Sequence, residues 1–191
     1  SLHGAGSIIT NRGGMKAEID IGLLWHSDSS GNLGVGALTV GHMELIRRAA
    51  ERAGVSTRLR LFRPYDSTPA YVSGFASRHD ITGKFMVSPT GYWKAVGALD
   101  LMLDIGAGDS FADIYPDKRF AYIIATKELC LLHGVPLAFA PQTIGPFSRS
   151  PHTGLARHVM EKALAVFARD PMSYEAIGNI APAARRFQAI D

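Results

Sequence analysis

The amino-acid sequence is short of the features that mark several classes of protein. Its one cysteine, Cys130, cannot form a disulfide within the chain, and no Cys/His spacing matches a zinc site. No apolar run approaches the ~18–20 residues that cross a membrane, and the first residues show no charged segment followed by an apolar signal core. The net charge is +3 with neutral histidines, without a basic block. These absences argue against a nucleic-acid partner and predict a cytoplasmic protein that uses no metal and no other cofactor.

What is present is a composition typical of a globular domain with a sizeable core. Of the 191 residues, 47% are hydrophobic and 19% are charged. The 20 glycines suit a fold with many tight turns between strands and helices. Residues 1–14 are rich in Gly and Ser and lack periodicity, which predicts a tag remnant or flexible leader. A strand pattern follows Met15, so one domain is expected over residues 15–191.

Short apolar runs alternate with segments of helical periodicity along most of the chain. The segment 63–90 is the exception, because its prolines, glycines and scattered aromatics predict an irregular stretch with one short helix. Such alternation is typical of βαβ units and a parallel sheet. The sequence therefore predicts an α/β fold, a Rossmann-like doubly wound parallel sheet of at least five strands with 19–25 central. The expected strands are 19–25, 57–62, 99–105, 136–140 and 164–168, and the expected helices are 36–53, 118–133, 153–162 and 173–179.

Polar loops follow four of these strands, at 25–36, 106–110, 141–147 and 169–173. Ligands of open parallel sheets bind beyond the carboxyl ends of the strands, so these loops are the candidate site. In the first two, glycines allow close backbone approach to a ligand, and a helix N-terminus favours an anion. For the first loop taken alone, a tight structural turn is the favoured explanation. In the second, Asp109 acts either as a base and hydrogen-bond acceptor or only as a helix cap.

The third and fourth loops carry a glutamine and an arginine at strand ends. Gln142 lies in a loop stiffened by two prolines and is expected to face the cleft. Arg169 follows a buried strand, where a guanidinium needs a partner, either Asp170 or a substrate carboxylate or phosphate. Asp170 is also placed to cap the next helix, with Pro171 at its first position. His26, at the end of the first strand, is a weaker acid/base candidate.

Taken together and in order, the four loops resemble the polysaccharide pyruvyl transferase family over about residues 19–179. One departure is Val35, where the family often has an acidic residue. The matching pieces are Gly31-Asn32-x-Gly34 before a helix, the turn with Asp104, Gly106 and Gly108, Pro141-Gln-Thr-Ile-Gly-Pro146, and Ala168-Arg-Asp-x-x-Ser173.

The resemblance implies one Rossmann-like half of a two-domain, glycosyltransferase-B-like architecture, whose second domain lies outside this chain and supplies much of the donor site. Whether this half is active alone stays open. It implies transfer of a pyruvyl ketal from phosphoenolpyruvate to the hydroxyls of a glycan or lipid-linked oligosaccharide in exopolysaccharide or cell-surface glycan synthesis. Peripheral membrane association through the acceptor fits this role. A glycosyltransferase and a non-catalytic glycan- or anion-binding domain are the alternatives. The implied catalytic residues are Asp109 and Arg169, and the implied substrate-binding residues are Asn32, Gly34, Gly106, Gly108, Gln142 and Ser173.

Overall fold

A computed structural model describes residues 18–106 and 111–189 of the chain. Its strands form one seven-stranded, all-parallel sheet in the order β3-β2-β1-β4-β5-β6-β7. The predicted α/β, Rossmann-like fold is therefore confirmed. The leader predicted at residues 1–14 lies outside the described residues. The strands are β1 (Glu18–Leu24), β2 (Ser56–Pro64), β3 (Ser77–Ile81), β4 (Leu101–Asp104), β5 (Leu137–Gln142), β6 (Ala165–Ala168) and β7 (Arg186–Gln188).

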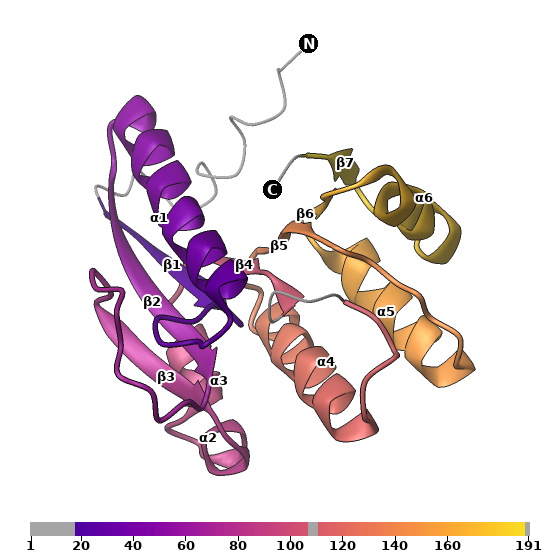
Figure 1. Cartoon of the computed structure of the whole chain (residues 1–191), viewed down its shortest axis with the longest axis horizontal. Helices are drawn as coiled ribbons and strands as arrows, with labels where there is room; N and C mark the ends of the chain where they lie inside the picture. Colours follow the sequence, from indigo (N-terminus) through magenta and orange to yellow (C-terminus); the bar gives the residue numbers. More distant parts are fainter. Residues whose placement is uncertain (1–17, 107–110, 190–191) are drawn as a thin grey trace.

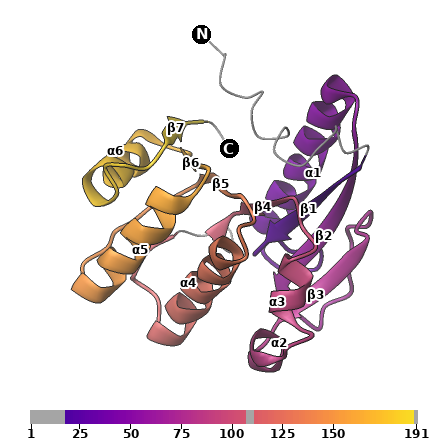
Figure 2. The same ribbon diagram turned by 180° about the vertical axis from the view of Figure 1, so that it is seen from behind.

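Helices cover the two faces of the sheet unequally (Figures 1 and 2). One face of β1 and β2 packs against α1, and the other face carries α3, α4, α5 and α6. Right-handed crossovers produce this division, because the chain moves one way from β1 to β3 and the opposite way from β4 to β7. No helix in the described ranges is long and apolar enough to cross a membrane. The helices are α1 (Leu33–Ala53), α2 (Gly83–Val87), α3 (Tyr92–Val96), α4 (Asp117–Leu132), α5 (Ser150–Lys162) and α6 (Pro171–Ile180).

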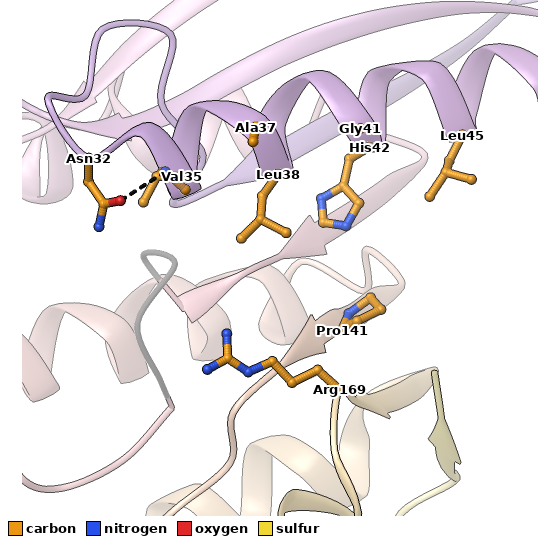
Figure 3. Close-up of a pocket in the computed structure, with 10 residues that line it drawn as sticks. Asn32, Val35, Ala37, Leu38, Gly41, His42, Leu45, Pro141 and Arg169 are labelled. Carbon is orange, nitrogen blue, oxygen red and sulfur yellow. Dashed lines mark hydrogen bonds between the residues drawn. The ribbon is translucent and has the colours of Figure 1, made fainter. Parts of the chain in front are cut away.

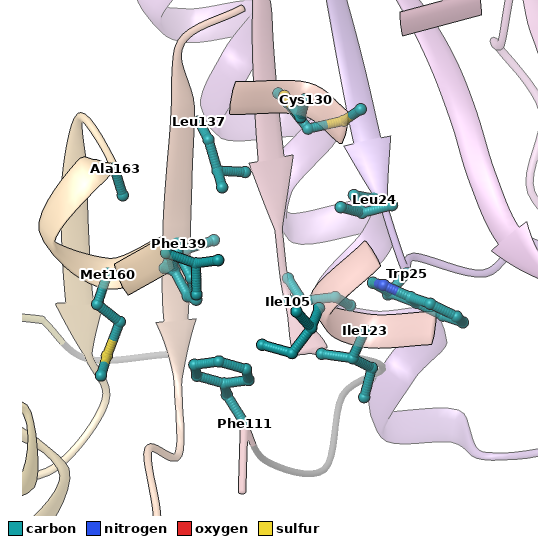
Figure 4. Close-up of a cluster of buried hydrophobic side chains, with 14 of the residues drawn as sticks. Leu24, Trp25, Ile105, Phe111, Ile123, Cys130, Leu137, Phe139, Met160 and Ala163 are labelled. Atoms are coloured by element: carbon teal, nitrogen blue, oxygen red, sulfur yellow. The ribbon is translucent and has the colours of Figure 1, made fainter. Parts of the chain in front are cut away.

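The larger core lies between the sheet and α3 to α6 (Figure 4). Strand side chains such as Leu24, Leu137 and Phe139 meet Ile123 of α4 and Met160 of α5, all of them buried. A fully buried side chain of this size contributes about 1.5–3 kcal/mol. Helices cover the central strands, and apolar side chains are therefore stable along most of their length.

Two edge strands and one short helix were missed by the sequence prediction. The segment 63–90, expected to be irregular with one helix, contains β3 as well as α2, and α3 follows it. At the edge of the sheet β3 pairs only with β2, and of its five residues only Ile81 is buried, so it lacks the apolar signal of an inner strand. At the opposite edge, β7 has three residues. The middle strand is β4, whereas β1, predicted to be central, is its neighbour.

The four loops singled out in the sequence follow β1, β4, β5 and β6, which are consecutive neighbours in the sheet. Because all strands are parallel, these loops leave the same edge. The strand order reverses between β1 and β4, and ligand crevices of doubly wound sheets open at this switch point. Of the second loop the structure describes Gly106, while the predicted site residues Gly108 and Asp109 lie outside the described residues.

Candidate functional site

A groove of about 450 Å³ lies between α1 and the carboxyl ends of β5 and β6. Leu38, His42 and Leu45 project from α1 toward Pro141 and Arg169 (Figure 3). The first, third and fourth predicted loops therefore all contribute to one groove. Its described lining consists of Asn32, Gly34, Val35, Ala37, Leu38, Gly41, His42, Leu45, Pro141 and Arg169.

The N-terminal end of the groove is the first turn of α1. Asn32 is the N-cap, and its Oδ1 accepts a hydrogen bond from the backbone N–H of Gly34 at 3.0 Å. The helix thus begins three residues earlier than predicted, at Leu33. Helix N-termini carry partial positive charge, so this end of the groove favours an anionic or electron-rich ligand group.

A buried carboxylate anchors the loop that leads into α1. Asp28 is fully buried and forms ion pairs with Arg63 of β2 and with Arg78 of β3, whose Nε lies 2.6 Å from its Oδ2. Arg63 also donates to Ser29 Oγ at 3.0 Å. These contacts hold the loop against two neighbouring strands. The position of Asn32 therefore depends on these long-range ion pairs as well as on its own capping hydrogen bond.

Arg169 extends from the end of β6 along the groove, toward the N-terminal half of α1 (Figure 3). Its side chain is about one-third exposed (36%), and its Nε lies 3.8 Å from Asp170 Oδ2. That separation is too long for a hydrogen bond. The structure therefore brings Arg169 and Asn32 to the same groove, while the role of either residue in binding stays a prediction.

Asp170 caps α6, as one of the two sequence interpretations predicted. Its Oδ1 accepts from the backbone N–H of Ser173 at 2.7 Å, and its Oδ2 accepts from Ser173 Oγ at 3.0 Å. Ser173 Oγ in turn accepts from the backbone N–H of Ile144 at 3.1 Å. The structure thus places the predicted binding residue Ser173 in a buried joint between α6 and the loop after β5, away from the described lining of the groove.

Gln142 lies beside an ion pair in the interior instead of lining the groove. Its Nε2 donates to the Asp104 carbonyl at 3.0 Å and to Asp104 Oδ2 at 3.2 Å. Lys127 of α4 donates to Asp104 Oδ1 at 3.0 Å, and both charged side chains are fully buried. Burial lowers the pKa of the Lys127 ammonium, and the Asp104 carboxylate offsets part of that effect.

Gly106 follows this cluster in a conformation that favours glycine. Its φ is +58°, and a Cβ built there lies 2.3 Å from Gln142 Oε1. The glycine therefore has a local packing reason in addition to its predicted role in substrate binding.

Two histidines form a hydrogen-bonded pair where β1 meets the groove. Trp25, directly after β1, lies in the left-handed region (φ +62°), a conformation that costs a bulky residue on the order of 1–3 kcal/mol. Its Nε1 donates to Thr126 Oγ1 of α4 at 3.1 Å. The next residue, His26, is fully buried, and its Nε2 lies 2.8 Å from His42 Nδ1. His26 therefore reaches the groove only through His42.

Burial makes both histidines hard to protonate. It lowers the pKa of His26 to about 3, and the neighbouring His42 adds a smaller effect of the same sign. Burial also lowers the pKa of His42. Both rings are consequently neutral near pH 7, where a neutral imidazole has one donor nitrogen and one acceptor nitrogen.

His42 is a groove residue that the sequence interpretation missed, because it shows no ligand spacing with other histidines. The signal available was helical spacing: Leu38, His42 and Leu45 stand at i, i+4 and i+7, which is one face of a helix. Apolar residues at such spacing are typical of a face packed on a core, whereas the structure shows this face lining the groove.

The charges of the groove suit an anion or a hydroxyl group better than a metal ion. Its described lining contains one cation, Arg169, and no carboxylate. In residues 18–106 and 111–189 no group of three or more His, Cys, Asp or Glu side chains could hold a metal. A cation beside a helix N-terminus fits a carboxylate or phosphate.

A family model for polysaccharide pyruvyl transferase matches residues 16–182, most of the chain. The chain therefore belongs to the polysaccharide pyruvyl transferase family, as its four loops predicted. Membership gives it a pyruvyl-transferase role in glycan biosynthesis, with a pyruvyl donor and a glycan acceptor. A comparison with curated proteins finds no match.

Proposed function

We propose that this member of the polysaccharide pyruvyl transferase family moves the pyruvyl group of phosphoenolpyruvate onto two hydroxyls of one sugar, forming a cyclic ketal. The acceptor is a free glycan or a lipid-linked oligosaccharide in exopolysaccharide or cell-surface glycan synthesis. The reaction takes place in the cytoplasm, and a lipid-linked acceptor brings the protein to the membrane surface.

One observation supports this donor most directly: Arg169 and the N-terminus of α1 share a groove at the carboxyl edge of the sheet. Phosphoenolpyruvate carries a carboxylate and a phosphate, and both groups bind guanidinium ions and helix N-termini. Arg169 offers the planar fork that binds such groups in a bidentate way.

The chemistry begins with a proton donor in the site. A general acid protonates the methylene carbon, which makes C2 electrophilic. The first hydroxyl oxygen bonds to C2, phosphate leaves with the electron pair of its C–O bond, and the second hydroxyl oxygen closes the ring. Of the two hydroxyl protons, one restores the acid and the other goes to the phosphate. We assign the base that takes up a hydroxyl proton to Asp109 and the binding of the donor to Arg169, with Asn32, Gly34, Gly106, Gly108, Gln142 and Ser173 shaping the site.

We also propose that a second Rossmann-like domain faces this edge and completes the donor site. The groove is open, and its described lining offers one cation for a donor with two anionic groups. Cations placed at both groups stabilise the charge that develops as phosphate leaves. The second domain is expected to supply them.

Phosphate release by the full-length protein tests the function. The protein is incubated with phosphoenolpyruvate and a panel of free and lipid-linked glycans, and the expected result is acceptor-dependent phosphate together with a glycan heavier by one pyruvyl ketal. Transfer from a nucleotide sugar with no phosphate release would identify a glycosyltransferase. Glycan binding without turnover of either donor would identify a binding domain.

A further inference from the structure

The His26–His42 pair has a definite direction of hydrogen bonding, set by a carbonyl at one end. His26 Nδ1 lies 3.1 Å from the carbonyl oxygen of Leu24. A carbonyl oxygen only accepts, so the proton of the neutral His26 ring is on Nδ1. Its Nε2 therefore carries a lone pair.

That lone pair determines the tautomer of the second ring. His42 Nδ1 lies 2.8 Å from His26 Nε2, so it must be the donor of this bond. A neutral His42 then has an unprotonated Nε2. No hydrogen bond joins this nitrogen to the residues that the structure describes, and His42 lines the groove. The chain from Leu24 through His26 thus leaves an acceptor at the surface of the groove.

The ligand group that suits this acceptor differs from the one that suits Arg169. A neutral imidazole nitrogen with a lone pair binds a hydroxyl or N–H donor and repels a carboxylate or phosphate oxygen. His42 lies ten residues beyond Asn32, about 15 Å along α1, and its neighbours Leu38 and Leu45 are apolar. The groove therefore has an end for anions near the N-terminus of α1 and an end for hydroxyl groups around His42.

We propose that His42 Nε2 binds a hydroxyl group of the glycan acceptor, and that His26 is the positioning residue that keeps His42 in its acceptor tautomer. This assignment rests on the proposed function, and it adds the acceptor side of the site. The ligand class is a hexopyranose with two hydroxyls close enough to form a five- or six-membered cyclic ketal. Leu38 and Leu45 give the apolar face of the sugar ring a surface to pack on.

The tautomers are testable without any turnover. In the chain labelled with 15N in its imidazoles, long-range proton–nitrogen spectra at pH 7 are expected to show neutral His26 and His42 rings, each protonated on Nδ1. Adding methyl hexopyranosides is expected to shift the His42 Nε2 resonance with at least one sugar. A His42 ring protonated on Nε2, or no shift across the panel, would overturn the proposal even if pyruvyl transfer is established.

Two substitutions separate binding from folding. Asn places its amide near Nδ1, so His42→Asn keeps the bond to His26 and loses the atom in the groove, whereas His42→Gln places an acceptor near Nε2. In the full-length enzyme, His42→Asn is expected to raise KM for the glycan about 2- to 13-fold, the effect of one neutral hydrogen bond. KM for phosphoenolpyruvate and the melting temperature should change little, and His42→Gln should recover part of the loss.

The matched control is His158→Asn, because His158 is exposed on α5 and contacts Glu128 outside the groove. An unchanged glycan KM in His42→Asn would refute the proposal, as would an equal rise in both KM values. If the full-length enzyme transfers no pyruvyl group at all, the proposed function fails, and the sugar titration still decides whether His42 binds a hydroxyl.

Discussion

Two clusters of buried polar side chains lie at the carboxyl ends of the strands, on opposite faces of the sheet. Their polar groups find partners in different ways. On the α4 side, Asp104 and Lys127 neutralise each other, and Gln142 donates to the second carboxylate oxygen. On the α1 side, His26 Nε2 and His42 Nδ1 share a hydrogen bond. The remaining ring nitrogen, Nε2 of His42, has no such partner among the described residues, and His42 lines the groove. The first cluster is buried throughout and holds the fold, whereas the second ends where a ligand can bind. The comparison separates residues whose loss should cost stability from residues whose loss should cost function.

The buried Asp104–Lys127 pair is expected to give the largest effect. Lys127→Met leaves the Asp104 carboxylate buried without its cation, and breaking such a pair costs about 3–5 kcal/mol of unfolding free energy. Urea denaturation of the two proteins measures the difference. The double variant Asp104→Asn with Lys127→Met removes both charges and keeps an amide for Gln142, so it should recover most of the loss. A single variant within 1 kcal/mol of the parent would show that the pair does not hold this edge together.

Arg169→Ala tests the open side, where function should be lost and stability kept. A charge-assisted hydrogen bond contributes about 1.5–3 kcal/mol, so kcat/KM for phosphoenolpyruvate is expected to fall roughly 10- to 150-fold. Arg169→Lys should recover only part, because lysine lacks the planar fork. The control is Arg48→Ala, on α1 but paired with Glu44 in solvent. Unchanged kinetics in a folded Arg169→Ala protein would remove the residue from the site, and aggregation would indicate a structural role beside Asp170.

The buried His26 ring is expected to make the free energy of unfolding depend on pH. Burial lowers its pKa to about 3 in the folded protein, against the ordinary value of 6.5 in the unfolded chain. Above pH 6.5 both states are neutral, so His26 adds no pH dependence. Below it the unfolded state takes up a proton first, and stability falls by about 1.4 kcal/mol per pH unit, or about 2 kcal/mol between pH 6.5 and 5. Urea denaturation at a series of pH values should show a shallower fall in His26→Gln, and equal slopes would contradict the buried, neutral ring.

The smallest effect on stability is expected at Asp170. This residue is next to Arg169 in the sequence, but its side chain caps α6 and does not line the groove. Asp170→Ala removes the N-cap of α6 and should cost about 1 kcal/mol of unfolding free energy, while Asp170→Asn should retain most of the cap. Thermal unfolding measures both. If Asp170→Ala reduced kcat/KM as much as Arg169→Ala, the distinction between these two neighbours would be wrong.

Local patterns predicted most of the fold because its inner strands are short apolar runs, as is typical of a parallel sheet covered by helices. Residues 136–140 and 164–168 were predicted as strands because they are short, continuous apolar runs, and β5 and β6 lie there within two residues. The helix cap formed by Asp170 and Pro171 was also predictable from the sequence, because capping involves only the residues of one turn. The edge strand β3 was missed, since a strand with one buried residue has no apolar pattern to detect.

The candidate site was predicted only as far as loop positions. Parallel strands end at one edge, so Asn32 and Arg169 were expected to lie near each other, and they share the groove. The direction of Gln142 was not predictable, because it depends on Asp104, which is far away in the sequence and adjacent in the sheet. Ser173 hydrogen-bonds to Asp170 in the cap of α6, and its role in binding stays a prediction.

By itself the sequence determined the parallel sheet, the four loops at its edge and the family, because periodicity, strand-end turns and short motifs are properties of neighbouring residues. Only the tertiary structure decided which buried polar groups neutralise one another and which face the groove. The His26–His42 bond joins the end of a strand to the third turn of a helix, and its polarity follows from a carbonyl oxygen of that strand. Hydrogen-bond direction depends on which atoms meet in space, and spacing along the chain does not encode it.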